Sequence, residues 1–126
     1  MNNKKIEVTF GQQILVVRFL DGAFIEEKDL REIYEYGNQK ANGKPYGILF
    51  EAVNHYSVAE DAIEFIANNP YSKDIIAKAY IIDTKEAELK AKAHLSFDHP
   101  SLKPFTFKTI EEGCAWLFSK LKEGNS

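Results

Sequence analysis

The stretch GILFEAV at residues 47–53 decides the fold of this chain, because it is apolar at both odd and even positions apart from Glu51. Side chains of a strand point alternately to the two faces of a sheet, so a strand that is apolar throughout is covered on both faces. Such a strand is central or parallel in its sheet. Since parallel neighbours are joined by a long crossover, usually a helix, the stretch predicts an α/β fold.

The residues before this stretch predict a β-hairpin and one helix. Apolar and polar residues alternate over residues 6–10, residues 11–13 interrupt the pattern, and an apolar run resumes over residues 14–19. Asp21 and Gly22 then predict a turn. The following helix buries one face and ends at Gly43 and Pro45. Its apolar stripe consists of Leu30, Ile33, Tyr34, Gly37 and Ala41.

After the stretch, Ser57 and Glu60 have the spacing of a capping box, in which a serine and a glutamate three residues later cap the start of a helix. A second helix is therefore predicted, and it ends at residues 68–70. A strand is predicted within residues 75–83. The apolar stripe of the second helix consists of Ala59, Ala62, Ile63, Ile66 and Ala67.

Residues 84–97 give two conflicting signals. Their composition of Ala, Glu, Lys and Leu favours a helix, but apolar residues alternate strictly over residues 87–97, as in a strand. We predict a helix, because Ala and Lys are poor strand residues and a parallel strand on each side needs a helical crossover. Two prolines within residues 99–104 predict a loop.

The C-terminal part predicts a short strand at residues 105–108 and a last helix. Thr109 and Glu112 repeat the capping-box spacing. The predicted order is β-β-α-β-α-β-α-β-α, a mixed sheet with an N-terminal hairpin followed by βα units, and residues 1–126 form a single domain. The buried stripe of the last helix consists of Ile110, Gly113, Leu117 and Leu121, with Trp116 and Phe118 flanking it.

Composition excludes several classes of function. The 16 Lys and Arg and 19 Asp and Glu give a net charge of −3, without the basic surplus that binds nucleic acid. The single Cys114 forms no internal disulfide, and no apolar run approaches the roughly 20 residues that cross a bilayer. No uninterrupted apolar stretch follows the N-terminal Met-Asn-Asn-Lys-Lys as in a signal peptide, so we expect a cytoplasmic protein.

Two loops are candidates for a functional site, because ligands of such sheets bind at the carboxyl ends of the parallel strands. One contains Asn54, His55, Tyr56 and Ser57, and the other contains Asp83. Ser57 has two interpretations. A hydroxyl at a helix N-terminus is a place where phosphate is stabilised, and serine is also a common structural cap.

The signal for catalysis or metal binding is weak. The sequence has no glycine-rich phosphate loop, and His94 and His99 lack the spacing of zinc ligands. We expect Cys114 to be a buried structural residue. An enzyme would need two or more of four candidate side chains within hydrogen-bonding distance, so we predict neither an enzymatic activity nor a cofactor. The four candidates are Asp21, His55, Ser57 and Asp83.

An aromatic group near the C-terminus also has two interpretations. These rings pack in the core of the domain, or they line an apolar ligand pocket with Tyr56 or His55 at its mouth. The rings assigned to the pocket are those of Phe97, Phe105, Phe107 and Trp116.

Several segments resemble the small bacterial STAS-like proteins, which are related to anti-sigma-factor antagonists and grouped with the lipid-carrying SEC14-like fold. The segments AKAYIID (77–83), LSFDHPSLKPFTFKT (95–109) and EEGCAWL (111–117) resemble the strand, helix, Pro-Phe strand and last helix of that group. ILFEAVNHYSVAEDAIEFI (48–66) is similar to its strand, polar loop and serine-capped second helix. The resemblance implies that Ser57 corresponds to the serine that a partner kinase phosphorylates.

The expected function is therefore a non-enzymatic regulatory or protein-interaction module that docks a protein partner or a second copy of itself. The edge of the N-terminal hairpin is the expected place for such self-pairing. A small apolar-ligand or lipid-binding protein of the SEC14-like type is the alternative.

Overall fold

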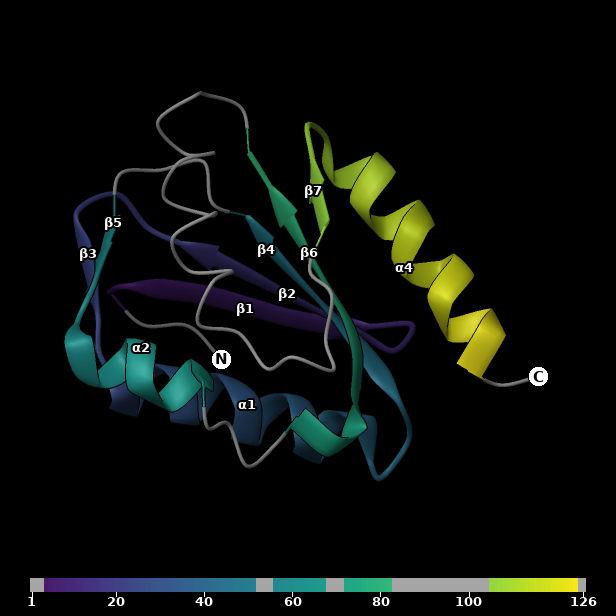
Figure 1. Ribbon diagram of the computed structural model, residues 1–126, viewed down its shortest axis with the longest axis horizontal. Coiled ribbons are helices and arrows are strands. Elements are labelled where there is room, and N and C mark those ends of the chain that lie inside the picture. The colour runs from purple at the N-terminus through teal and green to yellow at the C-terminus, as the bar shows by residue number, and fades with distance from the viewer. Residues whose placement is uncertain (1–3, 52–55, 68–71, 83–104, 125–126) are drawn as a thin grey trace.

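Five strands form the main sheet of this protein, whose structure is a computed structural model that describes residues 4–51, 56–67, 72–82 and 105–124. The strand order is β1-β2-β4-β6-β7, with β1 and β2 antiparallel and the other neighbours parallel (Figure 1). The predicted hairpin and all predicted strands are confirmed. The strands are β1 (Ile6–Gly11), β2 (Ile14–Phe19), β4 (Tyr46–Glu51), β6 (Ile75–Ile81) and β7 (Phe105–Phe107).

Strand β4 lies in the centre of the sheet, parallel to both of its neighbours, as its sequence predicts. Ile48 and Leu49, on opposite faces, are both fully buried. Glu51, the polar exception, lies at the end of the strand, where its carboxylate is 3.8 Å from the guanidinium of Arg18 on β2. The apolar run is thus explained by burial on both faces.

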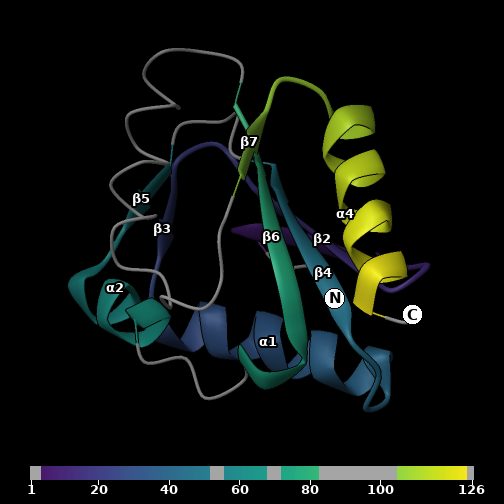
Figure 2. The same cartoon turned by 45° about the vertical axis from the view of Figure 1, so that its right-hand side comes forward.

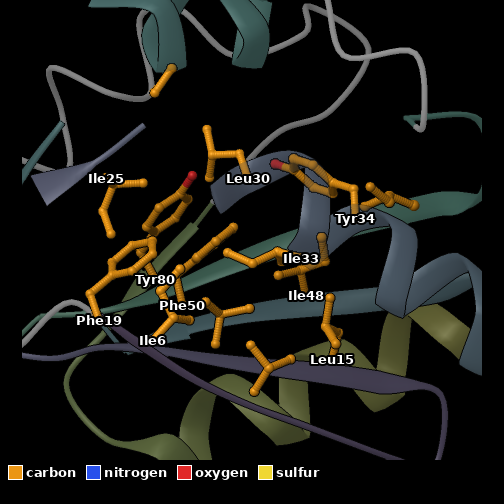
Figure 3. Packing of buried hydrophobic residues seen from close by; sticks show 14 of the residues in the cluster. Ile6, Leu15, Phe19, Ile25, Leu30, Ile33, Tyr34, Ile48, Phe50 and Tyr80 are labelled. Atoms are coloured by element: carbon orange, nitrogen blue, oxygen red, sulfur yellow. The ribbon is translucent and has the colours of Figure 1, made fainter. Parts of the chain in front are cut away.

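Helix α1 (Glu27–Ala41) covers one face of the sheet, as predicted, and α2 (Glu60–Ala67) packs beside it (Figure 1). Figure 3 shows the apolar cluster between α1 and the sheet, which contains Leu30 and Ile33 of the helix together with Leu15 and Ile48 of the strands. The helix ends at Asn42, whose φ of 54° is left-handed, and Gly43 follows with φ of 80°. The predicted stop is confirmed.

Helix α4 (Ile110–Gly124) covers the other face, over β4, β6 and β7 (Figures 1 and 2). Thr109 Oγ1 accepts a hydrogen bond from the Glu112 N–H at 3.2 Å, so the predicted cap forms. Leu117 and Leu121 are buried, but Ile110 is 39% exposed. The prediction that Ile110 is buried is wrong: as the first residue of the helix, it keeps more than a third of its surface in solvent.

A second, two-stranded parallel sheet was not predicted. It consists of β3 (Ala23–Ile25) and β5 (Tyr56–Val58), and it stands beside α2 in Figure 1. Ser57 therefore lies in a strand, and the prediction that it caps a helix is wrong. The carbonyl of Ala59 accepts the first helical hydrogen bonds of α2, from Ala62 and Ile63 at 3.1 Å each.

The predicted helix over residues 84–97, the loop over 99–104 and the end of the second helix at 68–70 lie outside the described residues. A single turn of 3₁₀ helix, η1 (Ser72–Asp74), precedes β6. No helix in the described parts of the chain is long and apolar enough to span a membrane.

The hairpin turn between β1 and β2 has an unusual backbone. Gln12 and Gln13 have φ of 53° and 64°, in the left-handed region. Gln13 is held in place because its Nε2 donates to the Pro45 carbonyl at 3.1 Å and its own carbonyl accepts from the Gly47 N–H at 3.0 Å. These contacts tie the turn to the start of β4.

A row of aromatic rings crosses the sheet on the α1 side. The ring centre of Phe19 lies 4.8 Å from that of Tyr56 on β5 and 5.9 Å from that of Phe50. The ring centre of Phe50 lies 5.0 Å from that of Tyr80. Figure 3 labels Phe19, Phe50 and Tyr80 in this cluster. The row joins the small sheet to the central strands.

Close packing of α1 on the sheet depends on Gly37. A Cβ at this position would lie 2.9 Å from Leu15 Cδ2 and 3.1 Å from the Tyr46 ring and hydroxyl. Tyr46 cannot move freely, because it is fully buried and its hydroxyl donates to Asn38 Oδ1 at 2.8 Å.

Gly37→Ala should therefore lower the free energy of unfolding by up to about 2 kcal/mol, because overpacking costs about 1–3 kcal/mol and the gain in helix propensity returns only roughly 1 kcal/mol. Gly11→Ala is the matched control, since a Cβ there meets nothing within 4 Å. Urea unfolding of the two variants measures the difference. Equal stability of both variants would contradict the packing argument.

Alkaline pH should destabilise the protein through Tyr56. Burial raises the pKa of Tyr56 from 10.0 to about 12. Between these values the unfolded chain loses the phenolic proton while the folded chain keeps it, so stability falls as pH rises, by up to about 3 kcal/mol. In Tyr56→Phe the free energy of unfolding should fall less steeply over this pH range. Part of the fall remains, because burial also raises the pKa of Tyr46. Identical pH profiles of variant and wild type would contradict this prediction.

Candidate functional site

The outward face of the small sheet carries an exposed aromatic ring beside an exposed hydroxyl. Phe24 and Ser57 are opposite each other in the β3–β5 register. Phe24 is 50% exposed, and Ser57 is also exposed. We call these two residues the β3–β5 surface.

Alternation in the two strands places these side chains outward. Their neighbours Ala23, Ile25 and Tyr56 are buried in the cluster beneath. Because side chains of a strand alternate between the two faces, burying Tyr56 against Phe19 directs Ser57 to solvent. The local fold therefore fixes the position of the hydroxyl.

Hydrogen bonds connect the small sheet to both neighbouring helices. The Ala59 N–H donates to the Ile25 carbonyl at 2.8 Å, which extends the pairing of β5 with β3. Asp61 Oδ1 accepts from the Glu27 N–H at 3.3 Å, so the starts of α1 and α2 are joined. Glu60 and Asp61 make the first turn of α2 acidic.

The start of α1 is also held by a cluster of charges. Lys5 Nζ lies 3.0 Å from Glu26 Oε1 and 3.0 Å from Asp29 Oδ2, and Asp29 is only 5% exposed. Asp29 Oδ2 also accepts from the Glu26 N–H at 2.9 Å. Hydrogen bonds to Glu26 and then to Asp29 raise the pKa of Lys5 above 10.5. This cluster fixes the chain that leaves β3.

The sequence-based site residues are only partly described. Tyr56 is buried and does not form part of an exposed loop, whereas Ser57 is exposed. Asn54, His55 and Asp83 lie outside the described residues, so convergence of the two candidate loops stays a prediction. The same holds for the enzymatic alternative, of whose four side chains only Asp21 and Ser57 are described.

Among the four rings assigned to an apolar pocket, Trp116 contacts two of the others. Trp116 is 4.7 Å from Phe105 and 5.6 Å from Phe107, between ring centres. These rings thus pack together at the junction of β7 and α4. Phe97 lies outside the described residues, and a ligand pocket that includes it stays a prediction.

Cys114 is partly buried on α4. Burial, and then the nearby Glu111, raise the pKa of its thiol. A raised pKa disfavours the reactive thiolate, which agrees with a structural role. The described residues contain no group of three or more His, Cys, Asp or Glu side chains that could hold a metal ion.

Sequence reasoning missed Phe24 at this surface and a buried lysine, Lys78, elsewhere in the fold. Phe24 belongs to the strand Ala23–Ile25, which at three residues is too short for its alternation to stand out. Lys78 is 1% exposed on β6, where its Nζ donates to the Tyr34 hydroxyl at 3.3 Å and lies 5.5 Å from the centre of that ring. The only indication in the sequence that Lys78 is buried is its place within an apolar run.

A solved structure shares this architecture. It is an uncharacterized protein of the DUF3478 family with a SpoIIAA-like fold from Shewanella loihica PV-4. The alignment has a TM-score of 0.60 at 14% identity and covers 93% of this chain and 98% of that chain. The fold is thus SpoIIAA-like, and the expected STAS-like α/β fold is confirmed.

No curated protein matches the sequence significantly. A family model does match, over residues 8–120, and its description is a domain of unknown function, DUF7793. Because this match covers most of the chain, the protein belongs to the DUF7793 family.

Proposed function

We propose that this protein is a non-enzymatic interaction module that docks a protein partner through the β3–β5 surface, and that phosphorylation of Ser57 switches this docking off. The observation that carries the proposal is the half-exposed ring of Phe24 directly opposite the exposed Ser57.

An exposed aromatic ring on a rigid base suits protein docking. Binding energy at interfaces is concentrated in a few residues, often aromatic, that insert into a pocket of the partner. Phe24 is fixed for this purpose, because its neighbours Ala23 and Ile25 are buried and β3 pairs with β5. Little conformational entropy is then lost when the ring is bound.

Ser57 is placed to control this contact. A phosphate on its hydroxyl adds close to two negative charges beside the apolar ring. When a partner covers the ring, those charges lose their hydration. A pocket shaped for the apolar Phe24 ring does not replace the lost interactions with water. Glu60 and Asp61 follow within the first turn of α2, which adds negative charge and deepens the effect.

Phe24→Ser should weaken docking strongly and leave folding unchanged. The expected loss of affinity is about 30-fold or more, the size typical of an aromatic anchor. Tagged wild type identifies the partner from a lysate of the source cells, and titration calorimetry with the purified partner measures the dissociation constant. Ile110→Ser is the matched control, since Ile110 is 39% exposed on α4, away from this surface.

The switch is tested at the same surface. Ser57→Ala should bind as wild type does, and Ser57→Asp should bind as weakly as Phe24→Ser, because a fixed charge stands where the phosphate would. Binding that survives both Phe24→Ser and Ser57→Asp would contradict the docking proposal. Loss in Phe24→Ser alone would retain the docking surface and refute the switch.

A further inference from the structure

Helix α4 carries a stripe of four exposed residues on its outward side. They are Glu111, Ala115, Phe118 and Lys122, and their spacing of four, three and four residues places them in one line along a helix. Phe118 is 36% exposed, a large apolar ring in the middle of this line. We call these four residues the α4 stripe.

The α4 stripe points away from the sheet. The residues of the same helix that face β4 and β6 are Gly113, Leu117 and Leu121, all of them buried. At 100° per residue, the stripe lies largely on the opposite side of the helix. In Figures 1 and 2 this side of α4 is at the outside of the molecule.

The order of residues makes the stripe complementary to itself. When two such helices run antiparallel and are centred between residues 116 and 117, Glu111 of each meets Lys122 of the other. At the same time Ala115 of each meets Phe118 of the other. Opposite charges are thus paired at both ends, and in the middle a large ring faces a small side chain, as close helix packing requires.

A groove beside the stripe leaves room for the second helix. It has a volume of about 500 Å³ and a mostly apolar lining. It lies between the hairpin turn and the C-terminal half of α4, next to Lys122. In the antiparallel arrangement, the first turn of the opposite helix would lie beside this groove. Its lining residues are Gln12, Gln13, Phe118, Leu121 and Lys122.

We propose that the α4 stripe is a homodimer interface at which two copies of this chain pack their α4 helices antiparallel. The resulting dimer has a sheet on each outer side and the two helices between them. This surface shares no residue with the β3–β5 surface, so each copy keeps a docking surface for a partner. Either proposal can fail without affecting the other.

Sedimentation equilibrium of the full chain over a range of concentrations tests this interface. The wild type should dimerise reversibly. Lys122→Glu and Glu111→Lys should each raise the dissociation constant about tenfold, because each change places like charges together at two symmetric contacts. Phe118→Asp should leave only monomer.

A double variant separates specific pairing from general charge effects. The two single changes shift the net charge in opposite directions, yet both should weaken the dimer. Glu111→Lys combined with Lys122→Glu restores opposite charges at both ends and should return the dissociation constant to within about threefold of wild type. Lys108→Glu, an exposed change on the loop before α4, is the matched control and should have no effect.

Circular dichroism and thermal unfolding confirm that each variant is folded. Both charge variants alter exposed side chains, so the test stands even where Phe118→Asp fails to fold. A wild type that stays monomeric at all concentrations would overturn the proposal. So would a dimer that is unchanged by both single charge reversals.

Discussion

Burial of β4 on both faces is the constraint on which the rest of this structure depends. A strand with Ile48 directed to one side and Leu49 to the other, both without solvent contact, needs an apolar layer above and below it. Helix α1 supplies one layer and α4 the other. Because β2 and β6 run parallel to β4, the chain crosses from one end of the sheet to the other between β2 and β4 and again between β4 and β6. Such crossovers are right-handed and the strand order is β2-β4-β6, so α1 and α2 lie on the same face of the sheet.

Much of this arrangement could be predicted from the sequence, where long patterns report burial directly. The apolar run of β4, the alternation in β1 and the stripe of α1 each extend over six residues or more. The small sheet could not be predicted, since its strands have three residues each and pair across a long sequence separation. The prediction that Ser57 caps a helix is wrong for the same reason. Its spacing to Glu60 fits a cap, but pairing with β3 keeps the backbone extended until Ala59. Ile110 shows that a helical stripe does not reveal how far burial extends at the end of a helix.

The candidate surface and the core are mechanically connected. The aromatic row runs from Tyr56 on β5 through Phe19 and Phe50 to Tyr80, so the strand that carries Ser57 is supported by the central strands. The fold thus holds Ser57, the residue proposed as the switch, on a rigid base, although no sequence motif marks this arrangement. The α4 stripe has a similar relation to the core, because the buried Leu117 and Leu121 fix the helix whose other side it occupies.

The turn at Gln12 and Gln13 has a consequence for the stability of the hairpin. Two-residue hairpin turns with positive φ at both positions favour Asn-Gly, whereas other residues carry a conformational cost there of the order of 1 kcal/mol each. Asn-Gly at this turn would relieve the backbone strain. The chain instead keeps two long amides, and one of them bonds to Pro45. The side-chain hydrogen bond from Gln13 to Pro45 offsets part of the backbone strain at this turn, and an Asn-Gly turn would lose it. The hairpin therefore depends on the segment just before β4 as well as on its own strand pairing.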